Sequence, residues 1–254
     1  MWSRMQKNKL VIANWKMEFS HKQSIDWLKL YYPELSQLAT TQPVELVVCP
    51  GFTCLPEFKK YLINTPLQIG AQDCSSYPHG PYTGQVAATS LKELNCHYCI
   101  IGHSETHSLT EHIAKKAALL MHNKIVPIAC IGETLAEKQA GKTVEILQQQ
   151  LTPILRAAQE SNCTQIIIAY EPVWAIGTGV APEAYDLKIL CHQIKLYCSQ
   201  FLDADKIRLV YGGSVNSKNC EKWLKIPEID GFLLGKASLD FQELKKIVVL
   251  VSNG

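Results

Sequence analysis

Short apolar runs recur along the chain, and they are continuous rather than alternating. They cover residues 10–13, 44–49, 67–71, 99–102, 125–130, 166–170, 207–211 and 232–235. A strand with one solvent-exposed face alternates apolar and polar residues, whereas a parallel strand buried on both faces is an unbroken run of Val, Ile and Leu. The runs therefore predict eight parallel strands that are covered on both sides.

The segments between the runs carry apolar residues at helical spacing. The clearest is Ile113, Ala114, Ala117, Leu120 and Met121, which follows a Ser-x-x-Glu capping-box pattern at residues 108–111. Similar patterns predict helices over residues 23–38, 143–160, 182–202, 216–224 and 238–251. Strands alternate with helices without a linker or a change of composition, which favours one α/β domain.

The length refines this prediction. Eight strand–helix units in 254 residues match a (β/α)₈ barrel, which takes about 250 residues. A doubly wound sheet gives the same alternation and stays open as an alternative, although no Gly-x-Gly-x-x-Gly follows the first run. We predict one (β/α)₈ barrel domain over residues 1–254.

Composition and charge exclude several classes of protein. Hydrophobic residues make up 47% and charged residues 19%, which excludes a disordered chain. The net charge of +2 indicates neither a nucleic-acid partner nor a basic membrane surface. The apolar runs are too short for a membrane span, and the basic start at residues 1–10 precedes too short an apolar stretch for a signal peptide. We expect a cytoplasmic protein.

Ten cysteines are present, and we expect reduced thiols rather than disulfides. Cys96 and Cys99 form a C-x-x-C pattern, but no second pair completes a zinc site. His103 and His107 lie four apart, which suits a metal only on a shared helix. No metal is expected.

Candidate chemistry follows the runs, at the carboxyl ends of the expected strands, where barrel active sites lie. Lys16 follows the first run, His103 the fourth, Glu171 the sixth and Ser214 the seventh, with Gly235 after the eighth. Each alone has an ordinary explanation, such as a surface lysine, a structural histidine or a tight turn. Together they bring a base, an acid, a cation and an anion-binding glycine turn to one rim.

Residues 172–182 form a different signal beside Glu171. Two glycines and two prolines surround Trp174, Ala175 and Ile176, which predicts a mobile flap with a hydrophobic tip, although an ordinary glycine-rich loop has the same composition. A lid is useful where an intermediate must be shielded from water. Burial beside Tyr170 is expected to raise the pKa of Glu171.

Six segments together resemble the triosephosphate isomerase family, in its order and approximate spacing. They are Ala13-Asn14-Trp15-Lys16, Gly70-Ala71-Gln72-Asp73, Ile101-Gly102-His103-Ser104-Glu105, Cys130-Ile131-Gly132-Glu133, the run from Ala169 to Gly179, and Tyr211-Gly212-Gly213-Ser214-Val215. The resemblance spans nearly the whole chain. It implies a TIM barrel that interconverts dihydroxyacetone phosphate and D-glyceraldehyde 3-phosphate through an enediolate, without a cofactor.

The resemblance also implies a role for each site residue. Glu171 is the base, His103 a neutral electrophile and Lys16 the electrostatic stabiliser. Asn14 orients a substrate oxygen, Glu105 supports Lys16, and Cys130 packs behind Glu171. The phosphate is held by Asn14, Lys16, Gly177, Ser214, Gly235 and Lys236, and the lid and its latch comprise Pro172, Trp174, Gly179 and Tyr211.

A loop at residues 73–85 resembles the family's interdigitating loop, in which Thr83 enters a neighbouring subunit, so a homodimer is implied. The chain departs from the family at Lys236, where a glycine is usual and a positive φ would cost about 1 kcal/mol. The flap's second hinge, Val180-Ala181, is shorter. Gln85 and Thr106, with His107 after it, replace charged residues with neutral ones.

Two other functions remain open on the residues alone. Another metal-free phosphate-binding barrel, such as a sugar-phosphate epimerase, shares the glycine turns, and a catalytically silent barrel shares the fold. The flap sequence around Glu171 disfavours the first. The second predicts the loss of Lys16, His103 or Glu171, and none is lost.

Overall fold

Eight parallel strands close into a barrel in the computed structural model, which describes residues 8–106, 108–176 and 181–254. The strands follow one another in chain order, and β1 pairs with both β2 and β8. Their bounds are β1 Lys9–Asn14, β2 Val44–Cys49, β3 Gln68–Ala71, β4 Cys96–Ile101, β5 Val126–Ile131, β6 Ile166–Tyr170, β7 Ile207–Tyr211 and β8 Gly231–Leu234. The predicted barrel is confirmed, and the doubly wound sheet is excluded.

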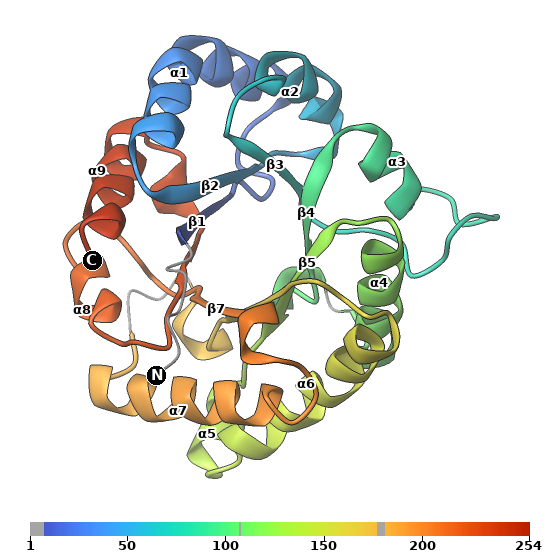
Figure 1. Cartoon of the computed structure of the whole chain (residues 1–254), viewed down its shortest axis with the longest axis vertical. Helices are drawn as coiled ribbons and strands as arrows, with labels where there is room; N and C mark the ends of the chain where they lie inside the picture. Colours follow the sequence, from blue (N-terminus) through green and yellow to red (C-terminus); the bar gives the residue numbers. More distant parts are fainter. Residues whose placement is uncertain (1–7, 107, 177–180) are drawn as a thin grey trace.

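Helices form a ring around the barrel (Figure 1). Their bounds are α1 His21–Thr41, α2 Leu55–Leu62, α3 Ala88–Glu93, α4 Thr110–His122, α5 Leu135–Gln139, α6 Thr143–Glu160, α7 Ala184–Cys198, α8 Cys220–Leu224 and α9 Phe241–Ser252. The long connection between β3 and α3 projects away from this ring, to the right in Figure 1.

Burial on both faces explains the continuous apolar runs. In β1, Leu10 and Ile12 join the cluster inside the barrel, while Val11 and Ala13 join the layer between strands and helices. All four are fully buried. Closure also needs a glycine: a Cβ on Gly231, whose φ is 154°, would lie 1.9 Å from the carbonyl oxygen of Leu10, so only glycine lets β8 approach β1.

Several expected boundaries differ from the structure. Strand β4 begins three residues early, at Cys96, because Cys96 and Tyr98 are buried although His97 between them is exposed. The capping box at residue 108 is wrong: the N-cap of α4 is Leu109 without a side-chain cap, and the Ser108 hydroxyl lies 3.2 Å from Lys116 Nζ instead. Helix α7 starts two residues later than expected, at Ala184.

Helix α8 also starts later than expected, at Cys220 rather than residue 216. Asn216 and Asn219 close a turn before it, because the Asn216 N–H donates to Asn219 Oδ1 at 2.8 Å and the Lys218 N–H donates to Asn216 Oδ1 at 2.9 Å. Asparagine side chains compete with helical backbone bonds in this way.

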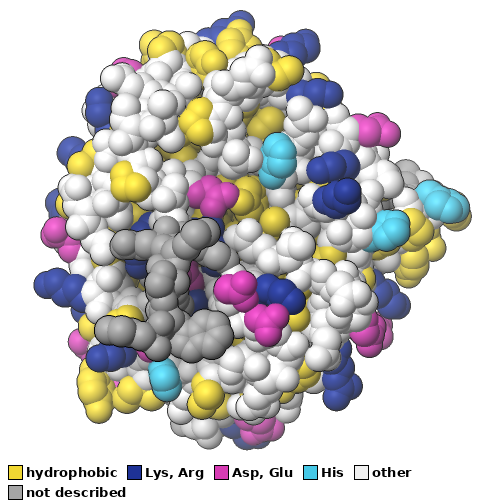
Figure 2. Space-filling view, in the orientation of Figure 1, with side chains coloured by type: hydrophobic (Ala, Val, Ile, Leu, Met, Phe, Trp, Pro, Cys, Tyr) yellow, Lys and Arg dark blue, Asp and Glu magenta, His cyan; other side chains and the backbone are white. Residues whose placement is uncertain are grey.

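All ten cysteines are free and buried. Cys96 and Cys99 both lie within β4. Among the described residues, no three His, Cys, Asp or Glu side chains are grouped so that they could hold a metal ion, and no helix has the length and apolarity to cross a bilayer. Figure 2 shows basic and acidic side chains interspersed over one face, in keeping with the small net charge.

Candidate active site

The carboxyl ends of β1, β4, β6 and β7 bring the main predicted residues together. His103 Nε2, after β4, lies 3.5 Å from Glu171 Oε2, after β6. Lys16, after β1, forms an ion pair of 2.6 Å with Glu105. A Cβ on Gly212, after β7, would lie 2.6 Å from Glu171 Cγ. Segments separated by more than 150 residues therefore build one site.

Glu171 is a buried carboxylate, with 7% of the residue exposed. Its backbone N–H donates to the Ile131 carbonyl at 2.8 Å, which fixes the residue directly after β6. Burial raises the pKa of the Glu171 carboxyl, while His103, a hydrogen bond from the Cys130 thiol, and Lys16 act in the opposite direction. Burial thus moves the pKa of this carboxyl toward the value that suits a base working near neutral pH.

The ring of His103 is buried, and its hydrogen bond defines its tautomer. Nδ1 accepts from the backbone N–H of Glu105 at 3.2 Å, so Nδ1 carries no proton and a neutral ring holds its proton on Nε2. Nε2 and Glu171 Oε2 face each other without a hydrogen-bond partner among the described residues. A single 3₁₀ turn, Ser104–Thr106, follows His103 directly.

Lys16 adopts a left-handed backbone conformation, with φ of 50°. Its N–H donates to Asn14 Oδ1 at 3.1 Å, and its ammonium donates to Glu105 Oε1 at 2.6 Å. A Cβ on Gly235 would lie 3.6 Å from Lys16 Cε, so the lysine side chain runs along the turn after β8. Lys16 thus contacts both Asn14 and Glu105.

The turn after β8 differs from the expectation for Lys236. Lys236 is exposed, begins a 3₁₀ turn at Lys236–Ser238, and is not among the described residues with positive φ. The expected backbone cost therefore does not arise. The Ser238 hydroxyl donates to the Gly235 carbonyl at 2.7 Å and holds this turn.

The described part of the predicted lid is tied to the barrel rim. The Ser214 hydroxyl donates to the Ala175 carbonyl at 3.2 Å, and Pro172 is buried beside Glu171. Tyr211 packs so close to Gly213 that a Cβ there would lie 2.1 Å from its hydroxyl oxygen. Gly177 and Gly179, with Val180 of the short hinge, lie outside the described residues, and so does His107.

Glu133 is a further residue of the site, beyond those predicted from the sequence. It follows β5 and is 1% exposed. The hydroxyl of Tyr170 and the indole N–H of Trp174 both donate to its carboxylate, the latter at 2.8 Å. Lys138 Nζ lies 3.5 Å from the centroid of the Trp174 ring, on its face. The rule that selected Glu171, an acid after a strand end, also finds Glu133.

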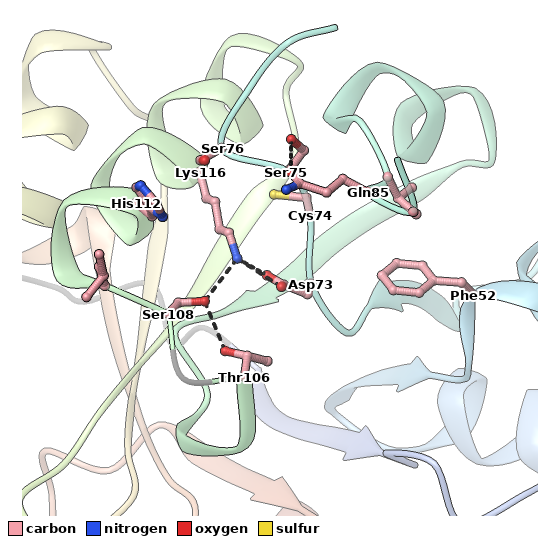
Figure 3. Close-up of a pocket in the computed structure, with 13 residues that line it drawn as sticks. Phe52, Asp73, Cys74, Ser75, Ser76, Gln85, Thr106, Ser108, His112 and Lys116 are labelled. Carbon is pink, nitrogen blue, oxygen red and sulfur yellow. Dashed lines mark hydrogen bonds and ion pairs between the residues drawn. The ribbon is translucent and has the colours of Figure 1, made fainter. Parts of the chain in front are cut away.

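A groove of about 480 Å³ lies next to this site. At its floor the Lys116 side chain reaches between Asp73 and Ser108, with Lys116 Nζ 2.7 Å from Asp73 Oδ1 (Figure 3). The wall includes Gln85, whose Oε1 accepts from the Ser75 hydroxyl at 2.6 Å. Other lining residues are Phe52, Thr106, Leu109 and His112.

The arrangement suits proton transfer at a carbon beside a carbonyl group. A buried carboxylate can accept a proton, an imidazole N–H can donate to the carbonyl oxygen, and an ammonium group lies on the same rim to offset the negative charge that develops. None of these three groups needs a bound metal to act.

Comparison with known proteins gives one consistent result. Residues 9–251 match a family model described as triosephosphate isomerase. Proteins named triosephosphate isomerase are 38% identical in Dictyoglomus turgidum, over 95% of this chain and 99% of that protein, and 38% identical in Thermus thermophilus, over 92% and 94%. The protein of that name from Buchnera aphidicola is 36% identical, over 95% and 97%.

Proposed function

The chain belongs to the triosephosphate isomerase family, and we propose that Glu171, His103 and Lys16 carry out its reaction. It is an enzyme that interconverts dihydroxyacetone phosphate and D-glyceraldehyde 3-phosphate, a step of glycolysis. The observation that carries the residue roles is the pair of facing atoms, His103 Nε2 and Glu171 Oε2, 3.5 Å apart and without other partners among the described residues.

Each proton has a defined path in this proposal. The Glu171 carboxylate removes a proton from C1 of dihydroxyacetone phosphate, the C–H electrons form the C1–C2 double bond, and the carbonyl electrons move onto O2. His103 donates its Nε2 proton to O2 and recovers one from O1. Glu171 then returns its proton to C2, which yields the aldehyde. Base and acid start and end in the same protonation states.

Charge is stabilised by the surrounding groups. Lys16 offsets the negative charge of the enediolate, Asn14 orients a substrate oxygen, and Glu105 holds the lysine at 2.6 Å. The phosphate is held by the turns at Ser214, Gly235 and Lys236, together with Gly177. Pro172, Trp174 and Gly179 belong to the lid, which Tyr211 latches when it closes. Lid closure excludes water from the intermediate.

The test of the roles is a coupled assay in both directions, with a chelator present throughout. We expect the wild type to convert both triose phosphates and His103→Gln to lose about 100-fold or more in kcat. His103→Gln at wild-type rates would remove histidine from the mechanism, and loss of wild-type activity in chelator would indicate a metal-dependent reaction.

We also propose that the enzyme works as a homodimer in the cytoplasm. The loop carrying Thr83 projects from the barrel (Figure 1), and Tyr82 on it stacks on Tyr77 with ring centroids 3.9 Å apart, which stiffens the loop. In a second copy, the groove above Lys116 is the cavity that we expect this loop to enter. Met17, 96% exposed, adds apolar surface beside Lys16 that association would bury.

Sedimentation of the purified chain tests the dimer. We expect a dimer at micromolar concentration and at least a tenfold weaker association for Tyr82→Asp, while Tyr185→Asp, at an exposed aromatic on α7, is the matched control. A monomeric wild type, or equal weakening in both variants, contradicts the loop-mediated dimer. Fractionation of cells that express the chain tests its cytoplasmic location.

A further inference from the structure

Gln72 holds the backbone of Lys16 through a side-chain amide whose two hydrogens are both used. It follows β3, and its Nε2 donates to the Lys16 carbonyl at 2.8 Å and to the Cys49 carbonyl at 3.0 Å. The amide orientation is unambiguous, because a flipped amide would point its oxygen at two carbonyl oxygens. One side chain thus links the ends of three neighbouring strands.

Lys16 needs such a support because its conformation is unfavourable. A residue with a Cβ seldom adopts a φ of 50°, and such conformations persist only where the surroundings hold them. The N–H of Lys16 is held by Asn14 Oδ1 at 3.1 Å and its carbonyl by Gln72 Nε2 at 2.8 Å. Both polar groups of this residue's backbone are therefore fixed by side chains.

We propose that Gln72 is a positioning residue, which fixes the left-handed turn at Lys16 and thereby directs the ammonium group toward the reacting oxygens. This rests on the role of Lys16 proposed above. Gln72 contacts the Lys16 backbone and acts through it. The effect of losing Gln72 therefore depends on Lys16 being a lysine, which separates this role from general stabilisation of the barrel.

Gln72→Met removes both hydrogen bonds and keeps the length of the side chain. We expect kcat/KM to fall about 10- to 100-fold, as small displacements of a catalytic group do, and the binding of 2-phosphoglycolate, a dianionic probe, to weaken in calorimetry. Gln68→Met is the control, since Gln68 lies at the start of β3 and, among the described residues, its amide donates to the nearby Pro66 carbonyl at 3.1 Å and not to Lys16.

A double-mutant cycle with Lys16→Met decides between the two roles. If Gln72 acts through the lysine, the double variant has the same kcat/KM and probe affinity as Lys16→Met alone. The proposal is overturned if the two losses multiply, or if Gln72→Met loses no more than Gln68→Met. If Gln72→Met does not fold by circular dichroism, Gln72→Asn enters the same cycle, because its shorter amide cannot span both carbonyls.

The same experiment separates this inference from the proposed function. If Lys16→Met itself has wild-type kcat/KM, the role of the lysine is wrong and the inference on Gln72 is overturned with it. If Lys16→Met is impaired and the Gln72 variants match Gln68→Met, the mechanism stands and only the positioning role is rejected.

Discussion

Gly212→Ala tests how closely the position of Glu171 sets the rate. A Cβ on Gly212 would lie 2.6 Å from Glu171 Cγ and 2.7 Å from its Oε1, whereas carbon atoms in contact lie about 3.5 to 4.0 Å apart. Residue 212 is not among those with positive φ, so alanine can adopt its backbone. The Glu171 carboxylate must therefore retreat by about 1 Å.

A retreat of this size has a predictable kinetic cost. A misplacement of about 1 Å costs on the order of 100-fold in rate, which corresponds to about 2.7 kcal/mol of activation free energy. We expect kcat to fall by this factor. KM should change little, because Lys16 and the turn after β8 are not displaced.

The assay is steady-state isomerisation of both triose phosphates, with circular dichroism to verify folding. Gly51→Ala is the matched control at the same rim: its φ of −57° suits alanine, and no atom lies within 4 Å of the added Cβ. It should keep wild-type kinetics. If folded Gly212→Ala also keeps its kcat within about twofold, the placement of Glu171 does not limit the reaction and the reasoning fails.

Three further outcomes follow from burial and charge. Burial raises the pKa of the Glu171 carboxyl, so its charged form destabilises the folded protein at pH 7. Glu171→Gln should therefore unfold at a higher temperature than wild type at pH 7, by about 2 to 4 °C for each kcal/mol of destabilisation that it removes. This difference in unfolding temperature should disappear as the pH falls below about 4.3, where the carboxyl is protonated in both the folded and the unfolded protein, and calorimetry across pH checks this. Lys236→Gly should raise KM by less than about fivefold, because Lys236 is an exposed charge without backbone strain, and initial-rate kinetics at two salt concentrations test it. Lys116→Met leaves the Asp73 carboxylate without its ion-pair partner and should lower the free energy of unfolding, measured in urea, by about 1 to 3 kcal/mol. Adding Asp73→Asn should restore part of this free energy, because it removes the unpaired charge.

The strands were predictable because a parallel strand with two buried faces is a continuous apolar run in the sequence. This pattern missed the start of β4, because the polar, exposed residue His97 interrupts the buried strand there. The sequence pattern also failed for the capping box, because it fixes residue types but not tertiary partners: the Ser108 hydroxyl accepts from Lys116 Nζ, which also binds Asp73.

The site followed from a positional rule, which selects polar residues after strand ends. That rule finds Lys16, His103 and Glu171, and the structure brings the last two within 3.5 Å. It does not show which side chains hold these three, since orientation depends on neighbouring strands. The roles of Gln72, whose amide binds the carbonyls of Lys16 and Cys49, and of Glu133, which accepts from Tyr170 and Trp174, therefore become visible only in the structure.

In the proposed mechanism one buried carboxylate, Glu171, moves the proton. Its most direct test is kcat for Glu171→Gln, measured beside 2-phosphoglycolate affinity on the same preparation. We predict a loss of about 100- to 10,000-fold in kcat with the probe still bound, because the amide keeps the shape of the carboxylate but cannot accept a proton from carbon. A kcat within tenfold of wild type would mean that a group other than Glu171 moves the proton.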